Sequence, residues 1–418
     1  MIGVGSSTTT IGVAGAVENS LIRFLAERGR RSDIDYRLLI PLVLNSAVVQ
    51  TIYALVRVTT SYRAIELNLP VVSLGIISAT FAVPPTLLAV WVGRLLDRGL
   101  DAQVAWIGSA VFVVTCTGFY FFSGSLSALL LLTALFGVGH LFVMASQQMV
   151  CIRCAGRRGR DAAFGNYVVA SVIGQGLGPY LIAWVGGTAS VPPTGTLFGI
   201  ALIVAVISLA TAAAIRPAPK HLRPEKAREV VPLRTLLQQR GLMAVLTASV
   251  ITITSQDLLT IYLPLLGADQ NIDVRNIGAL LTVRSVASLV SRLSYTRVLR
   301  LIARQPLTLL SMGGAGIGFA CFALPIPLPV MYAAMIFLGF SLGFATTLSL
   351  TNVVDLASAA AMGTVMSLRI TGNRLGQAAV PFLASLVATA TGVAGIFAII
   401  AVSLVTSGAS VHFSRQEH

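Results

Sequence analysis

Long apolar stretches alternate with short polar ones along most of this sequence. An apolar run of 18 or more residues is long enough to cross the hydrocarbon layer of a membrane as a helix. The first run follows a polar leader, which does not resemble a cleavable signal peptide. The pattern predicts an all-α integral membrane protein with twelve transmembrane helices. They are expected at residues 38–60, 71–92, 103–122, 127–150, 164–186, 195–215, 241–264, 276–294, 306–324, 328–350, 362–388 and 392–411.

The composition agrees with this class. The 418 residues are 56% hydrophobic and only 11% charged, and the mean hydropathy is +0.86. The net charge of +14 reflects topology, because 23 of the 29 Lys and Arg residues fall in alternate loops and the tails. The opposite loops hold two, and four lie within spans. This asymmetry predicts a cytoplasmic-membrane protein with both termini in the cytoplasm, and no nucleic-acid partner.

The longest polar stretch between spans divides the helices six and six. We therefore predict a cytoplasmic N-terminal segment (1–37), a first bundle (38–215), a cytoplasmic linker (216–240), a second bundle (241–411) and a cytoplasmic tail (412–418). The two halves share short matches at a nearly constant offset, which predicts a repeat of the same orientation. The clearest match pairs "GQGLGP" at 174–179 with "GQAAVP" at 376–381.

Two motifs point to a family. The loop after the second span reads "GRLLDRGLDAQ", and the fifth span reads "GNYVVASVIGQGLGPYLIAW". With the repeat, they give the chain a resemblance to the major facilitator superfamily. The matching residues are Gly93, Leu95, Asp97 and Arg98 in the loop, and Gly165, Gly174, Gly178 and Pro179 in the fifth helix.

The resemblance implies two six-helix bundles that rock about a central site. The loop departs from the family pattern, since Gly99 comes one place early and Leu100 and Asp101 replace basic residues. In the family, this loop holds helix ends together on the cytoplasmic side by charge pairing. Here that pairing is therefore expected to be weaker or to involve other residues. The fifth-helix pattern occurs in drug–proton exporters, but glycines also let membrane helices pack closely. Both interpretations stay open here.

Four arginines lie within predicted spans, where a charge facing lipid is costly. From the span ends, Arg284 is roughly 12 Å and Arg374 roughly 18 Å deep, close to the midplane of the bilayer. Two cations at this depth would suit a carboxylate or another anion. The alternative is an internal salt bridge or a contact with a backbone carbonyl.

Asp257 is the only acid that we place within a span. It could carry a proton, pair with Arg57 or Arg284, or lie exposed at the interface. Arg57 and Asp257 occupy equivalent depths in the first and seventh helices, so an ion pair between them would close the outer gate. Further candidates for the cavity wall are Asn45, Gln50, His140 and Gln256.

These features predict a secondary transporter and not an enzyme. The sequence has no Walker A, HExxH or GxSxG pattern. One CxxC, Cys151 and Cys154, lacks the second pair of a metal site, so no metal and no cofactor are expected. The predicted partners are a small-molecule substrate, protons or another coupled ion, and membrane lipids around a monomer. An organic anion is the first choice of substrate, and a drug or metabolite exporter is the alternative.

Overall fold

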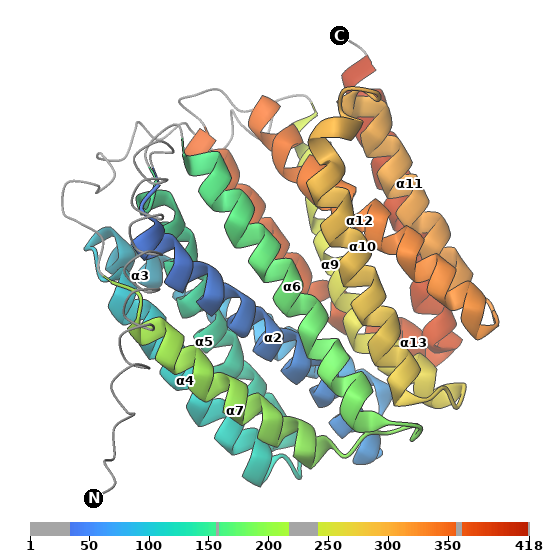
Figure 1. Cartoon of the computed structure of the whole chain (residues 1–418). Coiled ribbons are helices and arrows are strands. Elements are labelled where there is room, and N and C mark those ends of the chain that lie inside the picture. Colours follow the sequence, from blue (N-terminus) through green and yellow to red (C-terminus); the bar gives the residue numbers. More distant parts are fainter. Residues whose placement is uncertain (1–33, 156–158, 217–240, 357–361, 417–418) are drawn as a thin grey trace, which may run out of the picture.

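The computed structural model describes residues 34–155, 159–216, 241–356 and 362–416. Apart from one isolated β-bridge between Ile34 and Ala155, the regular structure in these ranges is helical. The predicted N-terminal segment up to residue 33 and the linker from residue 217 to 240 lie outside the described residues. Figure 1 shows α2 (Tyr36–Glu66), α3 (Val71–Asp97), α4 (Asp101–Phe122), α5 (Leu126–Arg153), α6 (Arg160–Gly186), α7 (Thr194–Ala213), α9 (Leu242–Asp269), α10 (Val274–Val298), α11 (Arg304–Phe322), α12 (Leu328–Leu356) and α13 (Met362–Gln416).

The last helix contains two of the predicted spans. Gly392 breaks α13 with φ 72° and ψ −176°, a backbone conformation that glycine adopts without a steric penalty. The break falls at the first residue of the predicted run 392–411, after the run 362–388, so each predicted run has a helical counterpart. By length and composition, ten described helices can cross a membrane, α13 being counted once. The remaining helix, α11, is the shortest, with 19 residues, and packs against α12 and α13.

The helices form two groups (Figure 1). Helices α2 to α7 pack mainly against one another, and α9 to α13 do the same. We call these groups the N-terminal and the C-terminal bundle. Three helix pairs make the main contacts between the bundles: α6 with α10, α3 with α13, and α2 with α9.

The helix ends define two faces. We call the end at which α2 begins and α13 finishes the terminal face, and the other end the opposite face (Figure 1). On the terminal face the backbone N–H of Asp35 donates to the carbonyl of Cys154 over 2.7 Å, which holds the start of α2 against the end of α5. The Asp35 side chain caps α2 by accepting from the N–H of Arg37.

Hydrogen bonds between the bundles lie at mid-depth or nearer the opposite face. Two of them join the connection after α6 to the start of α10 through backbone groups, and a third joins α6 to α10 closer to the middle. These contacts join the two bundles between the middle of the molecule and its opposite face. They are Val274 N–H to the Ala189 carbonyl (2.8 Å), Arg275 N–H to the Gly187 carbonyl (3.0 Å) and Thr282 Oγ1 to the Gly176 carbonyl (3.2 Å).

Helix α6 approaches two neighbours closely because of its glycines. A Cβ atom at Gly178 would lie 2.8 Å from the Cβ of Ala54, and one at Gly174 would overlap the carbonyl of Ala47. Both neighbours belong to α2. On another side of α6, the carbonyl of Pro179 lies against Gly278 of α10. Bilayer lipid is as apolar as leucine, so such tight packing is what holds these helices together.

Gly178→Val is therefore expected to destabilise the protein, since the added isopropyl group must force α2 and α6 apart. Overpacking of this kind costs about 1–3 kcal/mol. Gly165→Val is the matched control, because Gly165 is exposed and a Cβ there meets no described atom within 4 Å. Thermal unfolding of the purified protein in detergent measures both. Equal Tm values for the two variants would contradict the close packing.

Candidate functional site

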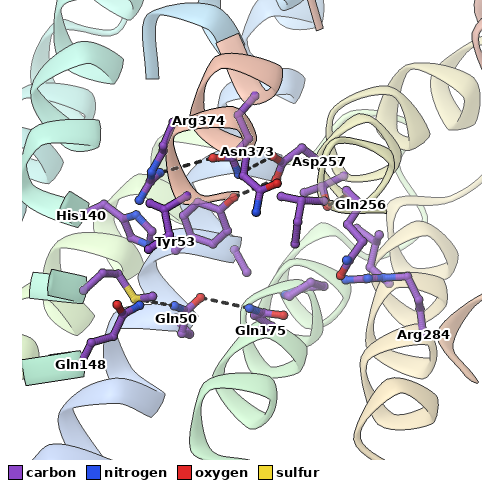
Figure 2. A pocket seen from close by; sticks show the side chains of 18 residues that line it. Gln50, Tyr53, His140, Gln148, Gln175, Gln256, Asp257, Arg284, Asn373 and Arg374 are labelled. Atoms are coloured by element: carbon purple, nitrogen blue, oxygen red, sulfur yellow. Dashed lines mark hydrogen bonds between the residues drawn. The ribbon is translucent and has the colours of Figure 1, made fainter. Parts of the chain in front are cut away.

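A cavity of about 330 Å³ lies between the bundles (Figure 2). Three helices of each bundle line it, α2, α5 and α6 on one side and α9, α10 and α13 on the other. Most of the residues that line it have polar side chains. Six carboxamide side chains contribute to it, three from each bundle: Gln50, Gln148 and Gln175, and Gln256, Asn373 and Gln377.

Both arginines predicted at the midplane line this cavity. Figure 2 shows Arg284 reaching in from α10 and Arg374 from α13, on different sides of the space. Arg284 is only 7% exposed, and its Nε has no hydrogen-bond partner among the described residues. Arg374 is partly engaged, because its Nη1 lies 3.4 Å from Oε1 of Gln377. The cavity therefore holds two cationic groups, of which Arg284 is the freer.

Asp257 stands at the centre of a hydrogen-bonded chain that crosses between the bundles (Figure 2). Its Oδ1 accepts from the hydroxyl of Tyr53 on α2 over 3.1 Å. Its Oδ2 accepts from Nε2 of Gln377 on α13 over 2.8 Å. Since Gln377 also accepts from Arg374, the chain runs Tyr53–Asp257–Gln377–Arg374. Asp257 is thus satisfied by neutral donors, with an arginine one step further away.

The predicted ion pair between Arg57 and Asp257 is not formed between these described side chains. Arg57 lies one helical turn beyond Tyr53, and its Nη2 donates to Oγ of Ser78 over 3.0 Å. Its guanidinium also lies 4.7 Å from the ring centroid of Phe81. Both partners belong to α3 of the same bundle. The prediction rested on the equivalent positions of Arg57 and Asp257 in the two repeats. The side chain of Arg57, however, points toward α3 and not toward α9.

His140 borders the cavity next to Tyr53. The two rings stack with centroids 4.7 Å apart and an interplanar angle of 24°. Both ring nitrogens are buried, and neither has a hydrogen-bond partner in the described part of the chain. A buried imidazole always carries one donor or more, so this ring presents unused hydrogen-bonding capacity at the cavity wall.

Gln50 and Gln256 also line the cavity, as predicted for the wall. Gln50 accepts from Nε2 of Gln175 over 3.2 Å and donates to Sδ of Met144. Gln256 donates to the hydroxyl of Thr346 on α12 over 3.0 Å. These bonds fix the orientation of both amides.

Asn45 lies elsewhere, against the prediction that it lines the cavity. It is fully buried inside the N-terminal bundle, where its Nδ2 donates to the carbonyl of Ser208 and the hydroxyl of Thr211. Its Oδ1 accepts from Gln147 over 2.7 Å. Asn45 therefore connects α2 to α5 and α7.

In the loop motif, the ion pair is formed by a residue that departs from the family pattern. Asp97 and Arg98 are exposed, and a Cβ at Gly93 would meet no described atom within 4 Å. By contrast, Asp101 is fully buried and forms an ion pair with Arg153 at the end of α5. Arg153 also donates to the carbonyl of Leu96 over 3.1 Å. This latch joins the ends of α3, α4 and α5 within one bundle.

Sequence reasoning missed several residues of the wall, among them Tyr53, Gln175, Asn373 and Gln377. A signal for two of them was present in the repeat. The matching "GQ" pairs place Gln175 and Gln377 at corresponding positions of α6 and α13, and both glutamines face the cavity. Tyr53 lies three residues after Gln50, a spacing that brings both to one face of a helix.

A polar cavity enclosed between two bundles of membrane-spanning helices is the architecture of a membrane transporter. The sequence profile of the Major Facilitator Superfamily matches residues 42–381 and 245–416. The chain therefore belongs to the Major Facilitator Superfamily, whose members are membrane transporters and not enzymes. Proteins of curated function give no significant sequence match.

Solved structures share the fold. The nucleoside transporter NupG superposes with a TM-score of 0.72 at 14% identity, covering 90% of this chain and 98% of its own. Its D323A mutant gives 0.74 at 13% identity, with 90% and 100% covered. The human organic anion transporter MFSD10 (TETRAN) gives 0.65 at 15% identity, with 90% and 99% covered. At such low identity these likenesses establish the fold alone.

Asn45→Ala is expected to lower thermal stability because it leaves the buried amide of Gln147 without its acceptor. An unsatisfied buried polar group costs about 1–3 kcal/mol. The measurement is Tm in detergent. The matched variant Gln148→Ala changes a carboxamide that lines the cavity on the same helix as Gln147, and should change Tm less. A Tm for Asn45→Ala equal to that of the unmodified protein would contradict the packing role.

Proposed function

We propose that this transporter is a secondary active carrier that moves a small organic anion across the cytoplasmic membrane by alternating access. The observation that carries the proposal is the charge of the cavity. Two guanidinium groups face it, while its one carboxylate, among the described lining residues, already accepts hydrogen bonds from Tyr53 and Gln377. A carboxylate ligand would find in Arg284 a bidentate partner that is already desolvated.

The charge distribution supports an orientation for this conformation. Under the positive-inside rule the terminal face is cytoplasmic. The hydrogen bonds between α6, its following connection and α10 then join the bundles on the outer side of the cavity. We therefore assign the structure to the inward-facing half of the transport cycle. In it, the outer gate is closed by backbone contacts and helix packing, without the Arg57–Asp257 pair.

Asp257 is our candidate for the proton carrier. When ionised, its carboxylate accepts from both Tyr53 and Gln377. After protonation of Oδ2 this oxygen becomes a donor, so Gln377 would have to rotate its amide and present its carbonyl instead. That rotation turns the amide N–H₂ toward Arg374, where two donors meet. Protonation of Asp257 at the oxygen that faces Gln377 would thus release Arg374 for an anionic substrate.

Other ionisable groups around this carboxyl come from four helices. Tyr53 faces it from α2, Arg284 from α10, Arg374 from α13, and His140 completes the wall from α5. No charged side chain from the described part of α12 lines the cavity. Asp257 is accordingly the one carboxyl group among the described residues that line the cavity.

The alternative function is a drug or metabolite exporter of the drug–proton antiporter type. The fifth-helix motif favours it, since Gly165, Gly174, Gly178 and Pro179 all lie on α6. Gly174 and Gly178, however, are explained by their close approach to α2. The motif therefore has a packing role that is independent of the direction of transport.

The anion proposal predicts that Arg284→Gln lowers anion uptake into proteoliposomes by at least about tenfold, because a charge-assisted hydrogen bond to the substrate is lost. The control is Arg297→Gln, which removes an exposed arginine from the same helix. The panel should contain labelled organic anions, nucleosides and cationic amphipathic drugs. Uptake of drugs or nucleosides with no uptake of anions would overturn the proposal.

Proton coupling predicts a different effect for Asp257→Asn. The variant should exchange internal for external substrate but no longer accumulate it when an inward proton gradient is imposed, since the titrating group is gone. Gln377→Met should retain gradient-driven uptake with weakened coupling, because it cuts the link from Asp257 to Arg374. Both are measured by counterflow and by gradient-driven uptake. Full proton-driven accumulation by Asp257→Asn would exclude Asp257 as the carrier.

A further inference from the structure

The cavity contains hydrogen-bonding groups that the protein leaves open. Asn373 accepts from Ser249 through Oδ1, and its amino group has no partner among the described residues. Gln175 and Gln256 donate through their amino groups, while neither carbonyl oxygen accepts a hydrogen bond in the described part of the chain. Both imidazole nitrogens of His140 also lack a partner among the described residues, but they are buried and do not face the cavity space.

These open groups would be satisfied by a ligand that carries hydrogen-bonding groups in addition to its negative charge. A carboxylate only accepts hydrogen bonds, so it can engage Arg284 but offers nothing to the carbonyl oxygens of Gln175 and Gln256. A hydroxyl group both donates and accepts, and can satisfy a carboxamide through either end. The unused capacity of the wall therefore matches a molecule that carries a carboxylate together with hydroxyl groups.

The polarity and size of the cavity agree with this match. Ligand sites are usually lined mainly by apolar side chains and span roughly 300–1,000 Å³. This cavity is at the small end, at about 330 Å³, and six of its lining side chains are carboxamides. A lipophilic anion would bury these amides without partners, which the site would reject.

The groups are also divided between the bundles. Arg284 and Arg374, which attract the carboxylate, both belong to the C-terminal bundle. Gln175, with its open carbonyl oxygen, belongs to the N-terminal bundle (Figure 2). A hydroxylated acid can therefore bridge the cavity, with its carboxylate on the C-terminal bundle and a hydroxyl group on Gln175 of the N-terminal bundle.

We propose that the substrate is a hydroxylated organic acid of small-metabolite size, whose carboxylate binds Arg284 and whose hydroxyl groups are recognised by Gln175 and Gln256. This inference rests on the proposed anion transport and specifies its substrate class. Gln175 is then a specificity-determining residue. It selects hydroxylated acids over unsubstituted acids of the same length and charge.

The test compares matched ligands on the purified full-length protein reconstituted in proteoliposomes. Gluconate, hexanoate and sorbitol share a six-carbon chain and differ in having both the carboxylate and the hydroxyl groups, the carboxylate alone, or the hydroxyl groups alone. Lactate and glycerate, each paired with propionate, extend the comparison to three carbons. We expect at least one hydroxylated acid to be taken up, and to bind about tenfold or more tightly than its unsubstituted partner and than sorbitol.

Variants separate recognition of the hydroxyl groups from recognition of the charge. Gln175→Met keeps the side-chain length but loses the carbonyl, and should weaken binding of the hydroxylated acid about tenfold while leaving the unsubstituted acid unchanged. Arg284→Gln should weaken both acids. A merely structural effect of Gln175→Met would change both acids equally, and that result would overturn its assigned role.

The remaining outcomes distinguish the two proposals. If unsubstituted acids bind as tightly as hydroxylated ones, anion transport stands and the hydroxylated class is wrong. If sorbitol, nucleosides or cationic drugs are carried and no acid is, both proposals fail. If none of the hydroxylated acids is bound or carried, the substrate class is overturned.

Discussion

The close approach of α6 to helices of both bundles is the contact on which the rest of the structure depends. Inside a bilayer, water supplies no force that drives apolar helices together, so association rests on packing and hydrogen bonds. Gly174 and Gly178 bring α6 against α2 of its own bundle, and Pro179 brings it against Gly278 of the other. One helix thereby contacts both bundles and presents Gln175 to the interior of the cavity.

The cavity reflects the repeat in its chemistry as well as in its helices. Three carboxamides come from each bundle, and the corresponding glutamines of α6 and α13 lie on opposite walls. The charges break this symmetry, since both lining arginines and Asp257 belong to the C-terminal bundle. The hydrogen bond from Tyr53 to Asp257 therefore joins the uncharged wall, from the N-terminal bundle, to the charged wall, from the C-terminal bundle. A proton or a ligand acting on Asp257 acts directly on the interface between the bundles.

Hydropathy predicted the twelve helical runs, and counting the rise per residue from the span ends singled out Arg284 and Arg374, which both line the cavity. Neither determined which way a side chain faces. Asn45 and Gln50 are five residues apart, about 140° around a helix, so one faces α7 and the other the cavity. The same limit explains Arg57, which has the depth of a gate residue but turns toward α3. Tyr53 and Gln377 were missed although each lies three residues after a predicted site residue, Gln50 and Arg374, and therefore on the same face of its helix.

The single-residue break at Gly392 has a mechanical consequence. The first part of α13 carries Arg374 and Gln377 and packs across the interface against α3, while α13 as a whole also packs against α11 at the outside of its bundle. The two parts of α13 run into each other through one glycine, so there is no loop to absorb displacement between them. A change in the angle between the two parts must therefore be taken up by the backbone dihedrals of Gly392 and its neighbours. Gly392 has no Cβ to restrict those dihedrals, so it is the point of α13 at which the ligand-binding part can tilt relative to the outer part.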